Sequence, residues 1–279
     1  MHRIVLTGVD GMLGRAWERL LQTRGLGFDA LRASWFDIRD PSAIDSEIRR
    51  GREVVINCAA FTDVDGAEHR EEEALRVNGT AVGELARRCA EVGALLVHYS
   101  TDYVFDGRAT QPYSADSPRD PVNAYGRTKA WGEQLLEASG CPHLLVRTSW
   151  LYAPWGKNFV RTMAGLAAER PRLRVVDDQR GRPTSAEHLA RTTLALLEAG
   201  KTGTYHVCDG GDCTWFELAR EVARAVRPEC VVEPCSSEEF VRPARRPAYS
   251  VLDLSGTEAV LGPMQHWREA VRSVVERLP

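Results

Sequence analysis

The sequence lacks long apolar runs, an excess of charge of either sign, and paired cysteines. No stretch approaches the roughly 18 consecutive apolar residues that a membrane-spanning helix requires, so we expect no membrane segment. Its 36 lysines and arginines nearly balance 39 aspartates and glutamates, which does not favour nucleic acid or an acidic membrane surface as a partner. The seven cysteines form no Cys-x-x-Cys pair, so neither a disulfide framework nor a zinc site is indicated.

The start of the chain also lacks the apolar core of a secretory signal peptide, because a short apolar run leads directly into a glycine loop. Together with the unpaired cysteines, this favours a cytoplasmic protein with reduced thiols. A chain of 279 residues is long enough for one large α/β domain and a smaller lobe.

Strand-like apolar runs alternate with amphipathic helical stretches through much of the chain, a rhythm typical of a parallel α/β sheet. We expect strands at 3–7, 29–33, 54–58, 95–100 and 144–148, and helices at 12–24, 43–50, 74–92 and 125–139. The predicted fold is therefore α/β, with a Rossmann-type doubly wound parallel sheet over residues 1–150.

Prolines interrupt shorter elements after this point, which indicates a smaller C-terminal lobe over most of residues 151–279. Helices are expected at 189–197 and 216–226. The β-like run 203–208 is expected to return to the main sheet, so segments near 186–210 are assigned to the first domain.

Three glycines, Gly8, Gly11 and Gly14, lie where the first expected strand closes and the first expected helix opens. A phosphate-binding turn requires this context, since glycine lets the backbone approach a pyrophosphate and the helix N-terminus directs unpaired N–H groups at the anion. A purely structural turn is the alternative. The residues expected to contact a dinucleotide here are Gly8, Asp10, Gly11, Met12, Leu13 and Gly14.

Arg32, and no carboxylate, stands near the end of the second expected strand. NAD enzymes place an acidic residue roughly 20 residues beyond the glycine loop, on the ribose 2′-hydroxyl. A guanidinium can instead pair with a 2′-phosphate. We therefore expect NADPH, with NADH also tolerated; a solvated surface arginine is the alternative.

Tyr125 and Lys129 lie four residues apart in an expected helix, so their side chains share one face. A nearby ammonium favours the ionised phenol, which otherwise has a pKa of about 10, and makes it a usable proton donor to a carbonyl. An ordinary helix surface pair is the alternative. Thr101 follows the expected strand 95–100, at the sheet edge where open α/β folds bind ligands, and its hydroxyl completes a candidate triad.

The segment Ser100-Thr101-Asp102-Tyr103-Val104-Phe105 carries a specific resemblance. Over nearly its whole length the chain resembles the dTDP-4-dehydrorhamnose reductase family, in the extended branch of the short-chain dehydrogenase/reductase superfamily. Further matching blocks lie at 63–68, 147–150, 156–159, 178–184, 203–206 and 243–247.

The resemblance implies hydride transfer from NADPH to C4 of a dTDP-4-keto-6-deoxy-L-sugar, with dTDP-L-rhamnose as product. Tyr125 would protonate O4, Lys129 would hold the nicotinamide ribose, and Thr101 would orient the carbonyl. Further cofactor contacts are expected at Asp37, Ile38, Cys58, Ala59, Ala60 and Thr62. The C-terminal lobe would be substrate-binding, and the expected sugar-pocket residues are Thr62, Val64, Thr101, Asp102, Tyr103, Tyr125, Trp150 and Asn158. Basic residues at Arg182 and 242–246 are candidates for the diphosphate.

One feature departs from the family pattern. Some members form a magnesium-bridged dimer through glutamates, one of them in the first helix, where this chain has Arg15 and Ala16. Glu18 and Glu187 do not rebuild a convincing oxygen cage. We therefore expect no metal and leave a homodimer open.

Three rival functions share part of this pattern. A nucleotide-sugar 4,6-dehydratase would have Asp-Glu after Thr101, where this chain has Asp102-Tyr103. An epimerase would retain the triad and reuse bound NAD, against the Arg32 interpretation. A non-catalytic regulatory subunit, like the related beta subunit of methionine adenosyltransferase, would bind the cofactor without turnover. Reductases of other 4-keto deoxysugars also stay open, because product stereochemistry depends on pocket shape.

Overall fold

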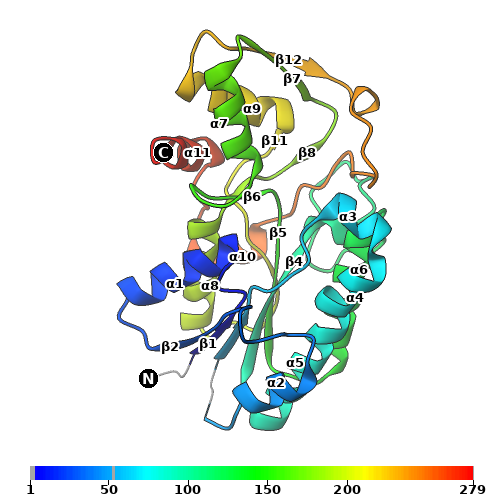
Figure 1. Ribbon diagram of the computed structural model, residues 1–279, viewed down its shortest axis with the longest axis vertical. Helices are drawn as coiled ribbons and strands as arrows, with labels where there is room; N and C mark the ends of the chain where they lie inside the picture. The colour runs from blue at the N-terminus through cyan, green and yellow to red at the C-terminus, as the bar shows by residue number, and fades with distance from the viewer. Residues whose placement is uncertain (1–3, 52–53, 279) are drawn as a thin grey trace.

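Six parallel strands form the central sheet of the computed structural model, which describes residues 4–51 and 54–278 (Figure 1). Arg3, expected in the first strand, lies outside the described residues. The strand order is β10-β5-β4-β3-β1-β2, and every neighbouring pair is parallel. The strands are β1 (Ile4–Thr7), β2 (Phe28–Leu31), β3 (Val54–Asn57), β4 (Leu95–Thr101), β5 (His143–Thr148) and β10 (Gly203–His206). The predicted Rossmann-type doubly wound sheet is confirmed.

The strands are apolar on both faces because helices cover both sides of the sheet. Successive residues of β1 alternate between two cores: Ile4 and Leu6 pack with α1 (Met12–Thr23) and α8 (Ala186–Glu198). Val5 packs on the opposite face with α2 (Pro41–Glu47) and α5 (Ala81–Val92). In Figure 1, α1 and α8 accordingly lie on one side of the sheet and α5 and α6 (Ala124–Ala138) on the other.

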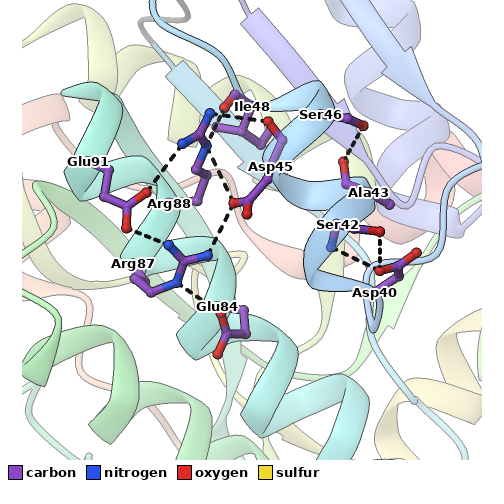
Figure 2. Close-up of polar contacts among 10 residues, drawn as sticks. All are labelled: Asp40, Ser42, Ala43, Asp45, Ser46, Ile48, Glu84, Arg87, Arg88 and Glu91. Atoms are coloured by element: carbon purple, nitrogen blue, oxygen red, sulfur yellow. Dashed lines mark hydrogen bonds and ion pairs between the residues drawn. The ribbon is translucent and has the colours of Figure 1, made fainter.

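Polar contacts fasten α2 to α5 at the outer corner of this second layer (Figure 2). Arg88 donates to the main-chain oxygen of Ile48 at 2.8 Å, while Arg87 pairs with Glu84 and Glu91 on its own helix and with Asp45 of α2. Because these pairs are largely exposed, their function is to orient α2 rather than to contribute much stability.

The helical stretch in place of the expected helix 74–92 begins earlier and is interrupted by a turn of different geometry. It starts with α4 (Glu71–Leu75), passes through a π-helical turn η1 (Arg76–Thr80), and continues as α5. Helix α6 approaches closely at this turn, since a Cβ at Gly132 would lie 2.1 Å from the Asn78 carbonyl oxygen. The turn aims the Asn78 amide at both main-chain polar groups of Phe61, which holds the segment after β3 in place.

A second lobe has its own apolar core, formed by three helices and one strand pair. The helices α7 (Phe159–Glu169), α9 (Trp215–Val226) and α11 (Trp267–Val275) pack together beside β7 (Arg172–Val176), which pairs with β12 (Val231–Cys235). The remaining elements are α3 (Val64–His69), η2 (Asp102–Val104), β6 (Leu151–Tyr152), β8 (Arg180–Gly181), β9 (Thr184–Ser185), β11 (Cys213–Thr214), η3 (Ser237–Glu239) and α10 (Ser255–Leu261).

The strand order places a ligand crevice at the carboxyl ends of the strands, which form one edge of the sheet. The chain leaves β1 toward β2 on one side and returns to β3 on the other, and open α/β sheets bind ligands beyond the carboxyl ends of the strands at such a reversal.

In the described residues, no helix has the length and apolar character needed to cross a bilayer.

Candidate active site

A cavity of about 610 Å³ lies at this edge, between the sheet and the second lobe. Its wall combines the glycine loop, the ends of β3 and β4, the start of α6 and the segment after β5. The predicted site residues that line it are Asp10, Gly11, Met12, Leu13, Cys58, Ala60, Thr62, Val64, Thr101, Asp102, Tyr103, Tyr125, Lys129, Trp150 and Asn158. The fold thus brings together side chains that are distant in the sequence.

Gly8 and Gly14 do not line the cavity; they allow the loop to close on itself. Gly8 has a φ of +67°, and a Cβ there would lie 2.4 Å from the Ala59 main-chain nitrogen. A Cβ on Gly14 would lie 2.1 Å from the Gly8 oxygen. Neither position accepts a side chain without displacing backbone, so their contribution to an anion site is the shape of the loop.

The N-terminus of α1 faces the cavity without a cap. Gly11 is the N-cap and supplies no side-chain acceptor, and the first turn contains no acidic residue. The first N–H groups of the helix therefore keep their hydrogen-bonding capacity and their positive dipole end. This donor set, with a loop that only glycine can form, fits a cofactor pyrophosphate.

Arg32 is held by carboxylates and is not simply solvated. Its guanidinium bonds to Asp10 at 3.0 Å and to Glu18 at 2.5 Å. A 2′-phosphate reaching Arg32 must therefore compete with Asp10, which also lines the cavity.

Three further predicted cofactor residues lie outside the cavity wall. Asp37 is paired with Arg39, and the Ile38 side chain is buried in the core, so only its main chain is available to an adenine. Ala59 donates its N–H to the Asn57 side chain.

Tyr125 is positioned by the first turn of α6. The Asn123 side chain caps the helix by accepting from the Gly126 N–H at 2.8 Å and donates to the Arg245 carbonyl oxygen at 2.8 Å. A Cβ on Gly126 would lie 2.1 Å from the Tyr103 carbonyl oxygen, so the helix presses on η2. As a result the Tyr103 and Tyr125 rings meet edge to face, with centroids 6.1 Å apart.

Lys129 lines the cavity together with Tyr125, but among the described residues its hydrogen bonds go elsewhere. Its Nζ donates to the Tyr99 carbonyl oxygen at 2.6 Å. Burial lowers the pKa of Lys129 to about 8. The pKa of Tyr125 is raised, mainly by burial and also by Asp102, while Thr101 opposes the rise. Without a cofactor the phenol is therefore a firmly protonated acid and not a partly ionised one.

Thr101 and Asp102 form one unit at the end of β4. The Thr101 hydroxyl accepts from the Tyr103 N–H and donates to Asp102 Oδ1 at 2.9 Å. Asp102 is buried, its Oδ2 has no hydrogen-bond partner, and burial raises its pKa to about 7. This oxygen is itself buried, and the Ser250 and Thr101 hydroxyls oppose the rise in the pKa of Asp102.

Aromatic rings form the opposite wall. Trp150 stacks on Trp215 with centroids 3.6 Å apart, and Phe159 packs on Trp215 at 4.5 Å. Trp150 has a φ of +48°, the only positive value among non-glycine residues in the described part of the chain. Such strain persists only where the surroundings enforce it. Asn158 also lines the cavity, but its amide caps α7 and bonds to the Ala153 carbonyl oxygen.

A second cavity of about 390 Å³ adjoins the first and shares Tyr103 and Trp215 with it. Three arginines line it together with Phe240: Arg174, Arg242 and Arg246. Two of the basic residues near 242–246, Arg242 and Arg246, line this cavity, where both pair with Asp65. Arg182 lines neither of these two cavities, and its guanidinium donates to the carbonyl oxygens of Leu252 and Gly211.

Comparison with known proteins places the chain in a family. The family model described as the RmlD substrate binding domain matches residues 1–279. The chain belongs to this family. It is 44% identical to a dTDP-4-dehydrorhamnose reductase of Mycobacterium tuberculosis, over 98% of the chain and 92% of that protein. It is 40% identical to a dTDP-4-keto-6-deoxy-D-glucose reductase of Streptomyces niveus, over 96% of the chain and 95% of that protein.

Solved structures agree with this assignment to the RmlD family. A dTDP-4-dehydrorhamnose reductase from Clostridium acetobutylicum superposes with a TM-score of 0.94 at 37% identity, covering 98% of both chains. One from Bacillus anthracis, in complex with NADP, superposes with a TM-score of 0.92 at 34% identity, also covering 98% of both chains.

Two features considered from the sequence, a dehydratase glutamate and a pair of metal-binding glutamates, can be compared with this RmlD-family site. A dehydratase would need a glutamate after Asp102, and Tyr103 occupies that position in the cavity wall. The two glutamates considered for a metal are both engaged by arginines, Glu18 by Arg32 and Glu187 by Arg277. Within the described residues, no cluster of three His, Cys, Asp or Glu side chains could hold a metal ion.

Sequence reasoning missed several residues of the cavity wall, among them Trp215 and Tyr99. Trp215 reaches the cavity because it is the first residue of α9, whose Thr214 and Glu217 form a capping box. That Thr-x-x-Glu pattern is visible in the sequence and predicts the helix start, but not the stacking partner. Tyr99 contributes through its carbonyl oxygen, which no side-chain motif could reveal.

Proposed function

We propose that the protein is an NADPH-dependent reductase that converts the 4-keto group of dTDP-4-dehydro-L-rhamnose to the hydroxyl of dTDP-L-rhamnose. The observation that carries this is the single cavity in which an uncapped helix N-terminus, Thr101 and the protonated phenol of Tyr125 converge. Family membership and the named relatives support the substrate class. The free cysteines fit a cytoplasmic enzyme.

The cofactor would lie along the edge of the sheet. The N-terminus of α1 would hold its pyrophosphate, Cys58 and Ala60 would lie along it, and Arg32 would meet the 2′-phosphate after releasing Asp10. When bound, the nicotinamide supplies the hydride. NADH serves as a weaker donor, because the α1 interaction does not depend on the extra phosphate.

Side chains of the protein donate the proton that the reduction requires and then replace it. Tyr125 keeps its phenolic proton at neutral pH because burial raises its pKa, so it can donate to the sugar O4. Thr101 orients the carbonyl from the end of β4, and its hydrogen bond with Asp102 fixes the hydroxyl rotor. Lys129, with a pKa of about 8, can return a proton to the phenolate.

We assign residues 151–279 mostly to substrate binding, with the segments near 186–210 returning to the first domain. Trp150 would cover the sugar ring. The second cavity would take the dTDP group, with Arg174, Arg242 and Arg246 facing the diphosphate and the rings of Phe240 and Trp215 against the base. A dianionic ligand requires such fixed cations.

A second candidate substrate is the isomer dTDP-4-keto-6-deoxy-D-glucose, favoured by the Streptomyces niveus relative. The test is NADPH oxidation, followed by absorbance, with each 4-keto sugar supplied separately and the product identified by NMR. Turnover of the L-sugar with dTDP-L-rhamnose as product supports the proposal. Turnover of the D-sugar alone replaces the substrate. Binding of NADPH without turnover of either sugar would instead favour a regulatory subunit.

A further inference from the structure

A buried polar chain runs from Lys129 into the sheet, away from the cavity. Lys129 Nζ lies 3.5 Å from His98 Nε2, and His98 Nδ1 lies 3.1 Å from Asn57 Nδ2. His98 and Asn57 are direct neighbours across β4 and β3. All three side chains are at most 2% exposed, and only Lys129 lines the cavity.

The orientation of the Asn57 amide is fixed by its neighbours. The Ala59 main-chain N–H lies 3.1 Å from Asn57 Oδ1, and the Thr7 hydroxyl donates to the same atom at 2.7 Å. Because a backbone N–H can only donate, the atom it contacts must be the amide oxygen. The NH₂ group of Asn57 therefore faces His98.

This orientation decides the tautomer of His98. The Asn57 NH₂ group has no lone pair to offer, so His98 Nδ1 must accept and carries no hydrogen. Burial and the Lys129 charge hold the pKa of His98 well below its usual range, so the ring is neutral. Its single N–H is then on Nε2, the atom that faces Lys129.

An Nε2–H group and an ammonium cannot hydrogen-bond to each other, because both only donate. A neutral amine can accept from Nε2–H. Among the described residues, the carboxylate that favours the ammonium is Glu133, one turn further along α6, and this group is also bound by Arg147 and Arg119. The titratable groups around Lys129, His98 and Asn57 come from several elements. They are Tyr99 of β4, His143 of β5, Tyr125 and Glu133 of α6, Cys58 after β3 and Asp102 after β4.

We propose that Asn57 and His98 are a positioning pair that sets the protonation of Lys129: by fixing the Nε2–H tautomer they weaken the hold of Lys129 on its proton. This rests on the proposed reductase function. After Tyr125 gives its proton to the sugar oxygen, the Lys129 ammonium gives one to the phenolate. The amine then accepts a hydrogen bond from His98 and regains a proton from water, so the net proton comes from solvent.

Asn57→Asp tests the pair by reversing the tautomer. A carboxylate accepts from Nδ1–H and leaves Nε2 bare, so the ammonium gains an acceptor. His98→Asn keeps the contact with Asn57 and removes the Nε2–H donor. In both variants the alkaline fall of kcat is expected to move upward by about one pH unit, the scale of one hydrogen bond to a charged group. His206→Asn, at a buried histidine of β10 outside both cavities, is the matched control. This variant should show the alkaline fall of kcat, the alkaline limb of the pH profile, at the same pH as the wild type.

A second measurement does not depend on activity. Nitrogen NMR shifts of the histidine rings in the full-length wild-type protein report each tautomer, and the His98 signals are assigned by their loss in His98→Asn. We expect neutral His98 with its hydrogen on Nε2 near pH 7. A hydrogen on Nδ1, a charged ring, or an unmoved alkaline limb in folded Asn57→Asp would overturn the proposal. The expected tautomer in a protein that reduces neither sugar would instead count against the reductase function alone.

Discussion

Asp102 offers the sharpest stability prediction, because its carboxyl group is buried and only half hydrogen-bonded. Thr101 donates to Oδ1, Oδ2 has no partner, and burial raises the pKa from 3.8 to about 7. The folded protein thus holds this proton more tightly than the unfolded chain does. The associated stability is fully present below about pH 4 and is lost as the pH rises through about 7.

The size of the effect follows from the pKa change. A rise from 3.8 to about 7 spans roughly three units, and each unit corresponds to about 1.4 kcal/mol. Ionising Asp102 therefore costs the folded protein on the order of 4 kcal/mol. Asp102→Asn keeps an acceptor for Thr101 but cannot ionise, so it removes this loss.

Urea unfolding of the cofactor-free protein between about pH 5 and pH 8 measures the effect as the free energy of unfolding. The wild type should lose stability across this range relative to Asp102→Asn. Asp116→Asn, at an exposed aspartate, is the control and should follow the wild type. Parallel curves for wild type and Asp102→Asn would refute the reasoning, because Asp102 would then ionise equally well in both states.

Three further substitutions probe the loop, the cofactor preference and the buried ion pair. Gly14→Ala should abolish NADPH binding in a fluorescence titration and reduce stability, because its Cβ would lie 2.1 Å from the Gly8 oxygen; unchanged affinity would contradict the role of the loop. Arg32→Ala should lower kcat/KM for NADPH more than for NADH, and an equal loss with both cofactors would exclude a 2′-phosphate contact. Glu133→Gln should destabilise the protein by about 3–5 kcal/mol in urea unfolding, because Arg147 is only 3% exposed and loses its charged partner. A change below about 1 kcal/mol would show that the pair is effectively solvated.

The sheet and most of the cavity wall were predictable from the sequence because local patterns determine them. Buried apolar runs mark parallel strands, and the carboxyl ends of such strands converge on one edge. Thr101 and the glycine loop therefore had to lie near each other. Helical spacing placed Tyr125 and Lys129 on one face, and the family resemblance gave them their expected roles.

Features that depend on packing between distant segments were not predictable. The π-helical turn at 76–80 lies where α6 approaches Asn78, and the stack of Trp150 on Trp215 joins residues from distant segments. Lys129 and Tyr125 line the same cavity, but the hydrogen bond from Lys129 to the Tyr99 carbonyl oxygen was not predictable. Spacing along a helix identifies which residues share a face and does not determine the hydrogen-bond partner of a long side chain.

The most direct test of the proposed chemistry compares Tyr125→Phe with Tyr113→Phe in single-turnover NADPH oxidation with dTDP-4-dehydro-L-rhamnose. Tyr113 is a buried tyrosine that bonds to Asp106 and lines neither cavity. Loss of a general acid should slow Tyr125→Phe by about 100-fold or more with NADPH binding intact, while Tyr113→Phe should turn over like the wild type. Wild-type turnover in Tyr125→Phe would contradict the assignment of Tyr125 as the proton donor.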